Sequence, residues 1–501
     1  MPISQKTLQQ VLLAVVILTA IFFRFWHIRD YVVFLGDEGR DMIIMRNIFI
    51  EKHLPFLGPS ASVGGFYLGP IYYWMAAPFL LLWHLDPVGP AYLVAILGVA
   101  TVLLLYKFIN EALGFWPAIL ASSLYGIAPL IIRYSRSSWN PNPLPFFSLL
   151  LIYFIYLGIK KKRYIYFLLA GASFGIAVQL HYLAAILFLI SAIIVCVNTN
   201  FKNWPKIAFL ATIGFLITFS PFLIFEIRHN FPNIRTILEF TTRGTTIGYK
   251  TTHFVWLVSN TGNILLEEIS LLRGTLLTKL VFWILSAGSI LGLILYRKDA
   301  QRKLIFTIGI VWFLGGILIL RSYTGQIYDY YFGFMFPAAF LVVALVIFIM
   351  WRKSVTRLAA LAFIAAALAL FASNGFYKTP PNRLIDQTEN IANFVIEKSQ
   401  NQPYNFALVS SSNSDHAYRY FLEIKNRSPK QLEEIVTDQL IVVCESEVCA
   451  PLGNPLWEIA GFGRAEIANE WQLPQYGFKV LRLTHWPGAP SPAGKPAVKG
   501  G

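Results

Sequence analysis

Two acidic residues, Asp37 and Glu38, follow the first long apolar stretch in the run Phe-Leu-Gly-Asp-Glu-Gly-Arg-Asp, residues 34–41. Ionisable side chains at the edge of a membrane span are costly next to lipid, so they mark functional sites by default. If a helix opens at Asp37, Arg40 and Asp41 share its face. A carboxylate oriented in this way can take a proton from a hydroxyl, which is general-base catalysis. The structural alternative is a solvated loop with an ordinary surface ion pair.

Further candidates come from polar residues in the connections between later apolar runs, namely Arg136, Asn140, Gln179, His181, Glu226, Arg321, Tyr328 and Tyr331. Arginine binds phosphate through paired hydrogen bonds, so Arg136 and Arg321 are candidates for a phosphate site. The alternative for an interfacial arginine is a side chain that extends to the lipid headgroups. A single histidine such as His181 is also more often a structural residue than a ligand.

Metal ligation is only weakly indicated. Glu226 together with His181 or His229 could hold a divalent cation, but their spacing is not diagnostic of a metal site. Cys444 and Cys449 have too short a spacing, with no second cysteine pair, for a convincing metal site. They allow a disulfide if that part of the chain is extracytoplasmic.

The composition is that of an integral membrane protein. Of the 501 residues, 56% are hydrophobic and only 13% are charged, whereas soluble proteins carry about 25% charged residues. The net charge of +15 falls in short blocks between apolar runs, which is the positive-inside pattern of membrane proteins. Because the basic residues form no arm or groove, the sequence indicates no nucleic-acid partner. The expected partners include the lipids of the membrane that the chain crosses.

Basic blocks also predict how the chain crosses the membrane. A span needs about 20 apolar residues, and the candidates are 11–28, 67–85, 88–106, 115–132, 143–159, 164–181, 183–198, 206–224, 279–296, 303–320, 332–351 and 356–374. With the basic blocks on the cytoplasmic side, both ends of 67–85 fall on the outer face, so this segment is predicted to be a juxtamembrane helix. We therefore expect an all-α bundle of about eleven crossings in a prokaryotic plasma membrane, with a cytoplasmic N-terminus. The candidate residues then lie at the outer face.

The chain becomes polar after the last span. Buried strands are predicted at 406–409, 440–443 and 479–483, and a helix at 416–424. Three domains are therefore predicted: a transmembrane domain over 1–375, a small extracytoplasmic α/β domain over 376–486, and a disordered Pro/Gly/Ala/Lys-rich tail over 487–501.

Residues 1–375 resemble the C-type superfamily of integral-membrane glycosyltransferases, which includes protein O-mannosyltransferases and lipid A aminoarabinose transferases. The motif Asp-Glu-Gly-Arg at 37–40 and the juxtamembrane segment before the second crossing support the resemblance most specifically. The loop from Arg136 to Asn140, the run at 221–232 and the tyrosine-rich entry to a late crossing, ending in Phe336 and Pro337, add to it.

The resemblance implies a polyprenyl-phosphate-sugar donor, with Asp37 as the catalytic aspartate and Glu38 positioning the substrate or the base. The acceptor would be a hydroxyl of a glycan, a lipid or a protein. Two positions depart from the family. Asn140 or Asn142 stands where some relatives have a second acidic residue, and Leu68 precedes Gly69-Pro70 where aminoarabinose transferases have a glutamate before proline. These departures count against a metal site of that kind and against that acceptor class.

The residues themselves are compatible with this chemistry. Arg136, Arg321 or His181 could stabilise the negative charge that develops on a leaving phosphate. A single base without an enzyme nucleophile predicts direct displacement with inversion at the sugar carbon. One alternative is a lipid or polysaccharide transporter or flippase, which would place polar residues in mid-span within paired broken helices. The other is a non-catalytic envelope assembly protein, in which Asp37 would be dispensable.

Overall fold

The computed structural model describes residues 4–61, 64–242, 254–270, 272, 276–321, 327–445 and 449–487. It divides the chain into two compact units. Unit 1 comprises Met1–Ile28, Leu54–Phe79 and Pro90–Pro380, and unit 2 comprises Arg29–His53, Leu80–Gly89 and Pro381–Gly501. Two segments that the sequence assigned to the transmembrane domain, 29–53 and 80–89, therefore belong to the same unit as the C-terminal residues. From residue 488 on, the predicted disordered tail lies outside the described residues.

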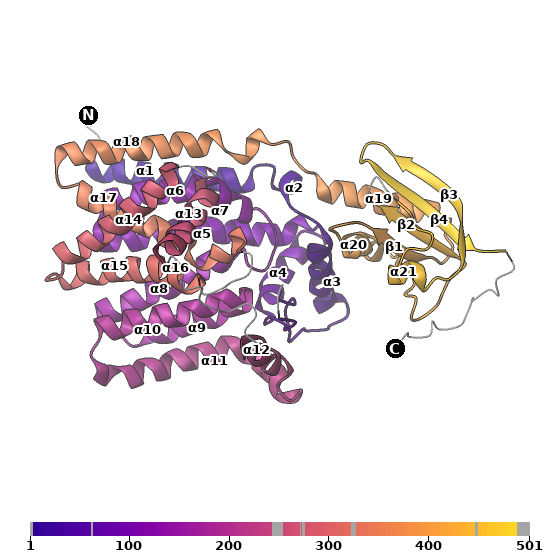
Figure 1. Ribbon diagram of the computed structural model, residues 1–501, viewed down its shortest axis with the longest axis horizontal. Helices are drawn as coiled ribbons and strands as arrows, with labels where there is room; N and C mark the ends of the chain where they lie inside the picture. Colours follow the sequence, from indigo (N-terminus) through magenta and orange to yellow (C-terminus); the bar gives the residue numbers. More distant parts are fainter. Residues whose placement is uncertain are drawn as a thin grey trace. The chain divides into compact units, whose positions relative to one another are not determined.

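Unit 1 is a bundle of apolar helices (Figure 1). Within the described residues, eight helical segments are long and apolar enough to cross a membrane. They consist of α1 (Gln5–Phe25), α5 (Val88–Leu113), α8 (Leu144–Lys161), η2 (Phe201–Asn203) with α11 (Trp204–Arg228), α14 (Leu276–Leu295), α15 (Ala300–Ile310) with η3 (Val311–Gly315) and α16 (Gly316–Leu320), η4 (Asp329–Met335) with α17 (Phe336–Met350), and α18 (Ser354–Ser373) with η5 (Phe376–Lys378).

The described residues also include four shorter apolar helices: α4 (Ile71–Leu82), α6 (Phe115–Ile127), α9 (Ile165–Leu180), and η1 (Tyr182–Ala185) with α10 (Ile186–Asn198). The last three coincide with the remaining predicted crossings, whereas α4 coincides with the segment predicted to be juxtamembrane. At about 1.5 Å per residue, the 12 residues of α4 span only about 18 Å of a hydrocarbon core of about 30 Å. This length agrees with the juxtamembrane helix predicted at 67–85. The predicted all-α membrane bundle is thus confirmed.

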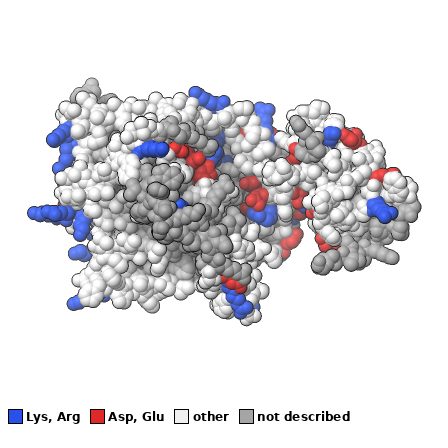
Figure 2. Space-filling view, in the orientation of Figure 1, with Lys and Arg blue, Asp and Glu red and all other residues white. Residues whose placement is uncertain are grey.

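The basic connections of unit 1 lie together at one end of the bundle. The turns from α10 to α11, α14 to α15 and α17 to α18 are at the left in Figure 1, and Figure 2 shows Lys and Arg side chains gathered at that end. Helix α12 (Pro232–Thr242) lies near the opposite end (Figure 1). Such a separation is what the positive-inside rule requires of a bundle whose basic turns share one side of the membrane.

Small residues let the helices of unit 1 pack closely. A Cβ atom at Gly171 of α9 would lie 1.9 Å from the carbonyl oxygen of Ala211 on α11. In return, a Cβ atom at Gly214 of α11 would lie 1.9 Å from the carbonyl oxygen of Leu168 on α9. Close backbone approach at small residues is the usual way in which helices associate within lipid.

One stretch of unit 1 differs from the prediction. No helix was predicted between the candidate spans 206–224 and 279–296, but this stretch contains α12 and α13 (Phe254–Ser270). Both helices mix polar with apolar residues, so neither has the continuous apolar run that marks a span. A short helix, α7 (Pro129–Tyr134), similarly follows α6 where one continuous span was expected.

Unit 2 contains a four-stranded sheet in the order β1-β2-β4-β3. Strands β1 (Asn405–Val409) and β2 (Gln439–Cys444) are parallel, and β4 (Phe478–His485) pairs antiparallel with β2 and with β3 (Ala465–Leu473). Helices α19 (Leu384–Lys398), α20 (His416–Ile424) and α21 (Trp457–Ala460) complete the C-terminal part. The predicted strands β1, β2 and β4 and the predicted helix α20 are present, whereas α19 and β3 were not predicted. Cys444 and Cys449 form a disulfide.

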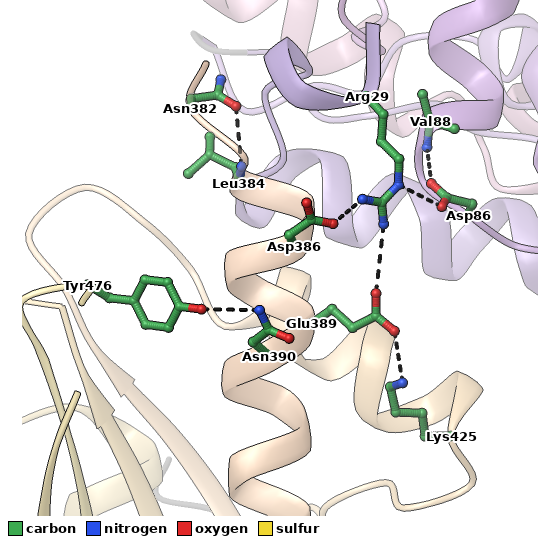
Figure 3. Close-up of polar contacts among 10 residues, drawn as sticks. All are labelled: Arg29, Asp86, Val88, Asn382, Leu384, Asp386, Glu389, Asn390, Lys425 and Tyr476. Atoms are coloured by element: carbon green, nitrogen blue, oxygen red, sulfur yellow. Dashed lines mark hydrogen bonds and ion pairs between the residues drawn. The ribbon is translucent and has the colours of Figure 1, made fainter. Parts of the chain in front are cut away.

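The segment Arg29–His53 contributes α3 (Gly36–Ile50), which packs against α20; the short α2 (Ile28–Tyr31) precedes it. A charged network links the three chain segments of unit 2 (Figure 3). Arg29 bonds Asp86 at 2.9 Å and also pairs with Asp386 and, at 3.7 Å, with Glu389. Lys425 bonds Glu389 from the end of α20 at 2.9 Å. One guanidinium thus joins residues that are far apart in the sequence.

Candidate functional site

The acidic motif lies in the first turn of α3. The helix opens at Gly36, so Asp37, Arg40 and Asp41 share a face, as the spacing predicted. The Arg40 guanidinium donates to Asp37 Oδ1 at 2.9 Å and to Asp41 Oδ1 at 2.8 Å. The Asp37 side chain is 62% exposed, whereas that of Asp41 is buried. Arg40 therefore ties an accessible carboxylate to a buried one.

This arrangement suits Asp37 to accept a proton. Arg40 fixes the orientation of the Asp37 carboxylate through a charge-assisted hydrogen bond. Among the described residues, Arg40 is the sole side chain bonded to the Asp37 carboxylate. Because the side chain is 62% exposed, an incoming hydroxyl could reach the carboxylate.

Glu38 has a different environment from that of its neighbour. It is buried, and its Oε2 accepts the backbone N–H of Leu35 at 3.0 Å, which closes the start of α3. Burial raises the pKa of Glu38 to about 7, the hydrogen bond from Leu35 opposes this shift, and the charges of Asp41 and Asp37 add to it. The geometry therefore gives Glu38 a role in holding the helix start that carries Asp37.

We expect Glu38→Gln to remove a pH dependence of folding stability. A folded-state pKa of about 7 against the ordinary 4.5 stabilises the protonated form, so this contribution is fully present below about pH 4.5 and is lost as the pH rises to about 7. The unfolding free energy of the wild type, measured relative to Glu38→Gln, should fall by about 3 kcal/mol over that range. Chemical denaturation of both proteins in nanodiscs from pH 4 to 8 measures it, and a constant difference would contradict it.

The start of α3 is held in place by residues just before α20. The backbone N–H of Gly36 donates to Asn413 Oδ1 at 2.8 Å, and Asn413 Nδ2 in turn donates to Glu445 at 3.0 Å. A Cβ atom at Gly39 would lie 2.3 Å from the backbone nitrogen of Ala417. Sequence reasoning missed these partners; the glycines on either side of the acidic pair were the one local signal of a close contact.

Two of the predicted substrate-binding residues bond backbone carbonyls of unit 1 instead. Arg136 donates to the carbonyl oxygens of Phe23 at 2.6 Å and Trp26 at 2.8 Å, and its guanidinium lies 4.0 Å from the centre of the Phe376 ring. Asn140 donates to the carbonyl oxygen of Leu180 at 2.7 Å. Both side chains are buried, so these contacts favour a role in fixing helix ends.

Gln179, His181 and Tyr331 gather at the end of α9. Gln179 donates to the carbonyl oxygens of Gly175 and Thr218, both at 2.8 Å. Its own Oε1 is buried and accepts no hydrogen bond from the described residues. His181 Nδ1 accepts the backbone N–H of Leu183 at 3.2 Å, which leaves Nε2 as the donor of the neutral ring. The Tyr331 ring centre lies 5.5 Å from that of His181.

Arg321 and Tyr328 flank this cluster in the sequence. Arg321 follows the last residue of α16, and its buried Nε has no hydrogen-bond partner among the described residues. The Tyr328 side chain is 45% exposed and its ring stacks on that of Tyr330 at 5.7 Å. Asp329, between them, instead bonds Arg133 and Tyr134. Arg321 thus has a buried N–H that no described residue accepts.

Glu226 forms the cap of α12. Its Oε1 accepts Asn233 Nδ2 at 2.7 Å and its Oε2 accepts the backbone N–H of Ile234 at 3.0 Å. His229 Nδ1 lies 2.9 Å from the carbonyl oxygen of Phe225. Over the described ranges, no three His, Cys, Asp or Glu side chains are grouped as metal ligands would be. The divalent cation remains a prediction from the sequence.

An apolar cavity of about 420 Å³ lies beside the His181 cluster. Its lining is apolar and aromatic, from Phe66, Leu68, Gly69, Val178, Tyr182, Leu183, Ile186, Phe219, Phe222, Phe240 and Leu320 among others. Gly69, in the lining of this cavity, packs closely against the buried amide of Gln179, because a Cβ atom at Gly69 would lie 2.3 Å from Gln179 Oε1. A second apolar cavity of about 470 Å³ lies between α13, α14, α17 and α18. The first combines an apolar volume with polar groups at its edge, as ligand sites do.

Comparison with solved structures identifies the architecture. ArnT from Cupriavidus metallidurans, bound to undecaprenyl phosphate, is similar with a TM-score of 0.57 and 12% sequence identity, over 96% of this chain and 98% of that one. The chain has the fold of the C-type membrane glycosyltransferases. The oligosaccharyltransferase from Archaeoglobus fulgidus, in its apo form, shares this fold with a TM-score of 0.54 and 14% identity, over 91% of this chain and 71% of that one.

Sequence comparison agrees with this fold. Residues 68–225 match the family model for dolichyl-phosphate-mannose-protein mannosyltransferase. No curated protein sequence matches the chain. The resemblance to C-type membrane glycosyltransferases predicted from the sequence is therefore confirmed. The matched residues include α4, η1 and the segment Leu68-Gly69-Pro70, which lacks a glutamate.

Proposed function

We propose that the protein is a membrane glycosyltransferase that moves a sugar from a polyprenyl-phosphate donor to a hydroxyl acceptor at the outer face of a prokaryotic plasma membrane. The main support is Asp37, an exposed carboxylate held by Arg40 at the start of α3, in a chain with this fold. ArnT, which has the same fold, binds undecaprenyl phosphate. In this proposal the N-terminus is cytoplasmic and unit 2 is extracytoplasmic.

The reaction needs one base. As the acceptor oxygen forms its bond to the anomeric carbon, the O–H bond breaks and the proton moves to Asp37. The bond between the anomeric carbon and the donor phosphate breaks at the same time, and polyprenyl phosphate leaves with the electron pair. Because no enzyme nucleophile intervenes, the configuration at this carbon inverts. Within unit 1, Arg321 Nε and His181 Nε2 are hydrogen-bond donors of the kind that stabilises the charge on a phosphate.

The apolar cavity beside His181 is assigned to the start of the polyprenyl chain. Its walls carry mostly hydrocarbon and aromatic side chains, and its volume of about 420 Å³ suits the first isoprene units, with the remainder of the tail among the lipids. The polar groups at its edge would then meet the phosphate. A transporter would have no need of an exposed base such as Asp37.

Turnover of defined donors tests this function. We expect the purified protein in nanodiscs to release or transfer sugar from at least one member of a panel of undecaprenyl-phosphate-linked hexoses and pentoses, with membrane glycolipid extract as acceptor. Excess undecaprenyl phosphate should inhibit this turnover because it occupies the donor site. Absence of turnover with every donor, together with absence of undecaprenyl phosphate binding, would refute the proposal.

Filling the cavity should weaken lipid binding. We expect Val178→Trp, which places an indole against the lining at Val178, to raise the dissociation constant of undecaprenyl phosphate at least tenfold, because the large ring removes volume from the proposed tail site. The matched control is Ala367→Trp in the second cavity of about 470 Å³, which should leave binding unchanged. Microscale thermophoresis in nanodiscs measures both, and an equal effect of the two variants would contradict the assignment.

A further inference from the structure

The segment Asn413–His416 borders the acidic motif within unit 2. Asn413 accepts the backbone N–H of Gly36, and a Cβ atom at Gly36 would lie 1.9 Å from Ser414 Oγ. A Cβ atom at Gly39 would lie 2.5 Å from the carbonyl carbon of His416. Two consecutive contacts on either side of Asp37 and Glu38 therefore bring this segment against the first turn of α3.

His416 is a titratable residue of that segment and the first residue of α20. Its Nδ1 is 3.0 Å from Ser414 Oγ and 3.7 Å from Asp415 Oδ1. In the tautomer in which Nδ1–H donates to Ser414 Oγ, the neutral ring presents Nε2 as an acceptor. The side chain is 43% exposed, and Nε2 bonds none of the described residues. This nitrogen is thus open to both a proton and water.

Charged groups on α3 and at the start of α20 interact with His416. Burial lowers its pKa; Asp415 acts against this, Arg40 and Arg419 lower the pKa further, and Asp37 raises it, with a net value below the ordinary 6.5. Helix α19 also packs against α20. Its Glu389, however, bonds Arg29 and Lys425 at the far end of α20. His416 is therefore neutral at pH 7 and interacts electrostatically with both Asp37 and Arg40.

We propose that His416 takes up the proton that Asp37 has removed from the acceptor hydroxyl and so returns Asp37 to its carboxylate form. This step rests on the proposed function. The proton leaves the Asp37 carboxyl oxygen, binds Nε2 of His416 and passes to water at the exposed edge of the ring; no electron transfer is involved. Because His416 acts through Asp37 and not on the substrate, it is a positioning residue whose role is to set the route by which the proton leaves.

This role gives the C-terminal part of the chain a share in catalysis. Ser414 bonds Nδ1 of His416, Asn413 fixes the helix start, and His416 accepts the proton, and all three belong to four consecutive residues. A sheet domain that served only to bind a partner would not need this segment to close on the acidic motif.

The test compares His416→Gln with wild type in nanodiscs, using the panel donor that the wild type turns over fastest. We expect kcat to fall at least tenfold with an unchanged dissociation constant for undecaprenyl phosphate. Neutral His416 is the acceptor, so the wild-type kcat should rise with pH through a midpoint below 6.5, and this limb should be absent in His416→Gln. Imidazole in the buffer should restore part of the activity of His416→Ala, because the ring site is open to solvent.

His53→Gln, an exposed histidine after α3 in the same unit, is the matched control and should behave as wild type. An unchanged kcat and pH profile in His416→Gln would overturn the inference. So would a loss of activity with the pH limb intact and no rescue by imidazole, since that pattern indicates a structural role alone. Failure of the proposed function gives a different result, because the wild type would then turn over no donor.

Discussion

Replacement of Asp37 by asparagine should lower the rate of sugar transfer at least about 100-fold and leave the protein folded. Asparagine has the shape of aspartate, but its amide cannot take up the acceptor proton. The substitution has little structural cost, because the Asp37 side chain is 62% exposed and Arg40 keeps its bond to the buried Asp41. Initial rates with the active panel donor, together with a thermal melt in nanodiscs, measure the two parts of this prediction.

The matched control for this variant lies on the same helix. Glu51→Gln removes an exposed carboxylate at the C-terminal end of α3 and should retain wild-type activity. The anomeric configuration of the product, read by NMR, tests the direct displacement at the same time, since one base without an enzyme nucleophile gives inversion. Wild-type turnover by a folded Asp37→Asn protein would eliminate Asp37 as the base.

Alanine at Gly39 should disturb both stability and catalysis. Its Cβ atom would lie 2.3 Å from the nitrogen and 2.4 Å from the Cα atom of Ala417, so the obstacle is backbone and cannot rotate away. Helices α3 and α20 must then separate. Overpacking of this kind costs about 1–3 kcal/mol, and a 1 Å displacement of a catalytic group can lower the rate by about 100-fold.

Differential scanning fluorimetry and donor turnover measure the two effects of Gly39→Ala. Gly315→Ala is the control, because the nearest atom to a Cβ atom there is 3.8 Å away. It should change neither the melting temperature nor the rate. If Gly39→Ala also matched the wild type in both measurements, the close packing of α3 on α20 would not be needed for the function of Asp37.

The membrane spans and three of the four strands could be predicted because their signals are local. A span is a continuous apolar run, and buried strands such as β1 and β2 are short runs of apolar residues between polar stretches. The helices α12, α13 and α19 escaped prediction because they mix polar with apolar residues. Strand β3 is largely exposed and therefore lacks an apolar run.

In the candidate site, too, contacts with a local sequence signal could be predicted and contacts between distant residues could not. The pairing of Arg40 with Asp37 follows from helical spacing, so the sequence predicted it, whereas the bond from Arg40 to the adjacent Asp41 was not predicted. Partners distant in the chain left no such signal. Nothing near Gly36 indicates Asn413, and nothing near Arg136 indicates that its guanidinium would bond the carbonyl oxygens of Phe23 and Trp26. Residue type suggested a phosphate ligand there, whereas the final packing of α1 determined the actual partners.

The discontinuity of unit 2 has a consequence for biosynthesis. Helix α3 leaves the ribosome early, but the sheet, α19 and α20, on which it packs, are made only after the last helix of the bundle. Until then, Gly36 and Gly39 have no partner surface and Arg29 lacks two of its three carboxylates. An interrupted chain that stops after α18 would enter the membrane with the acidic motif unsupported. The support of the acidic motif therefore depends on the residues that are translated last.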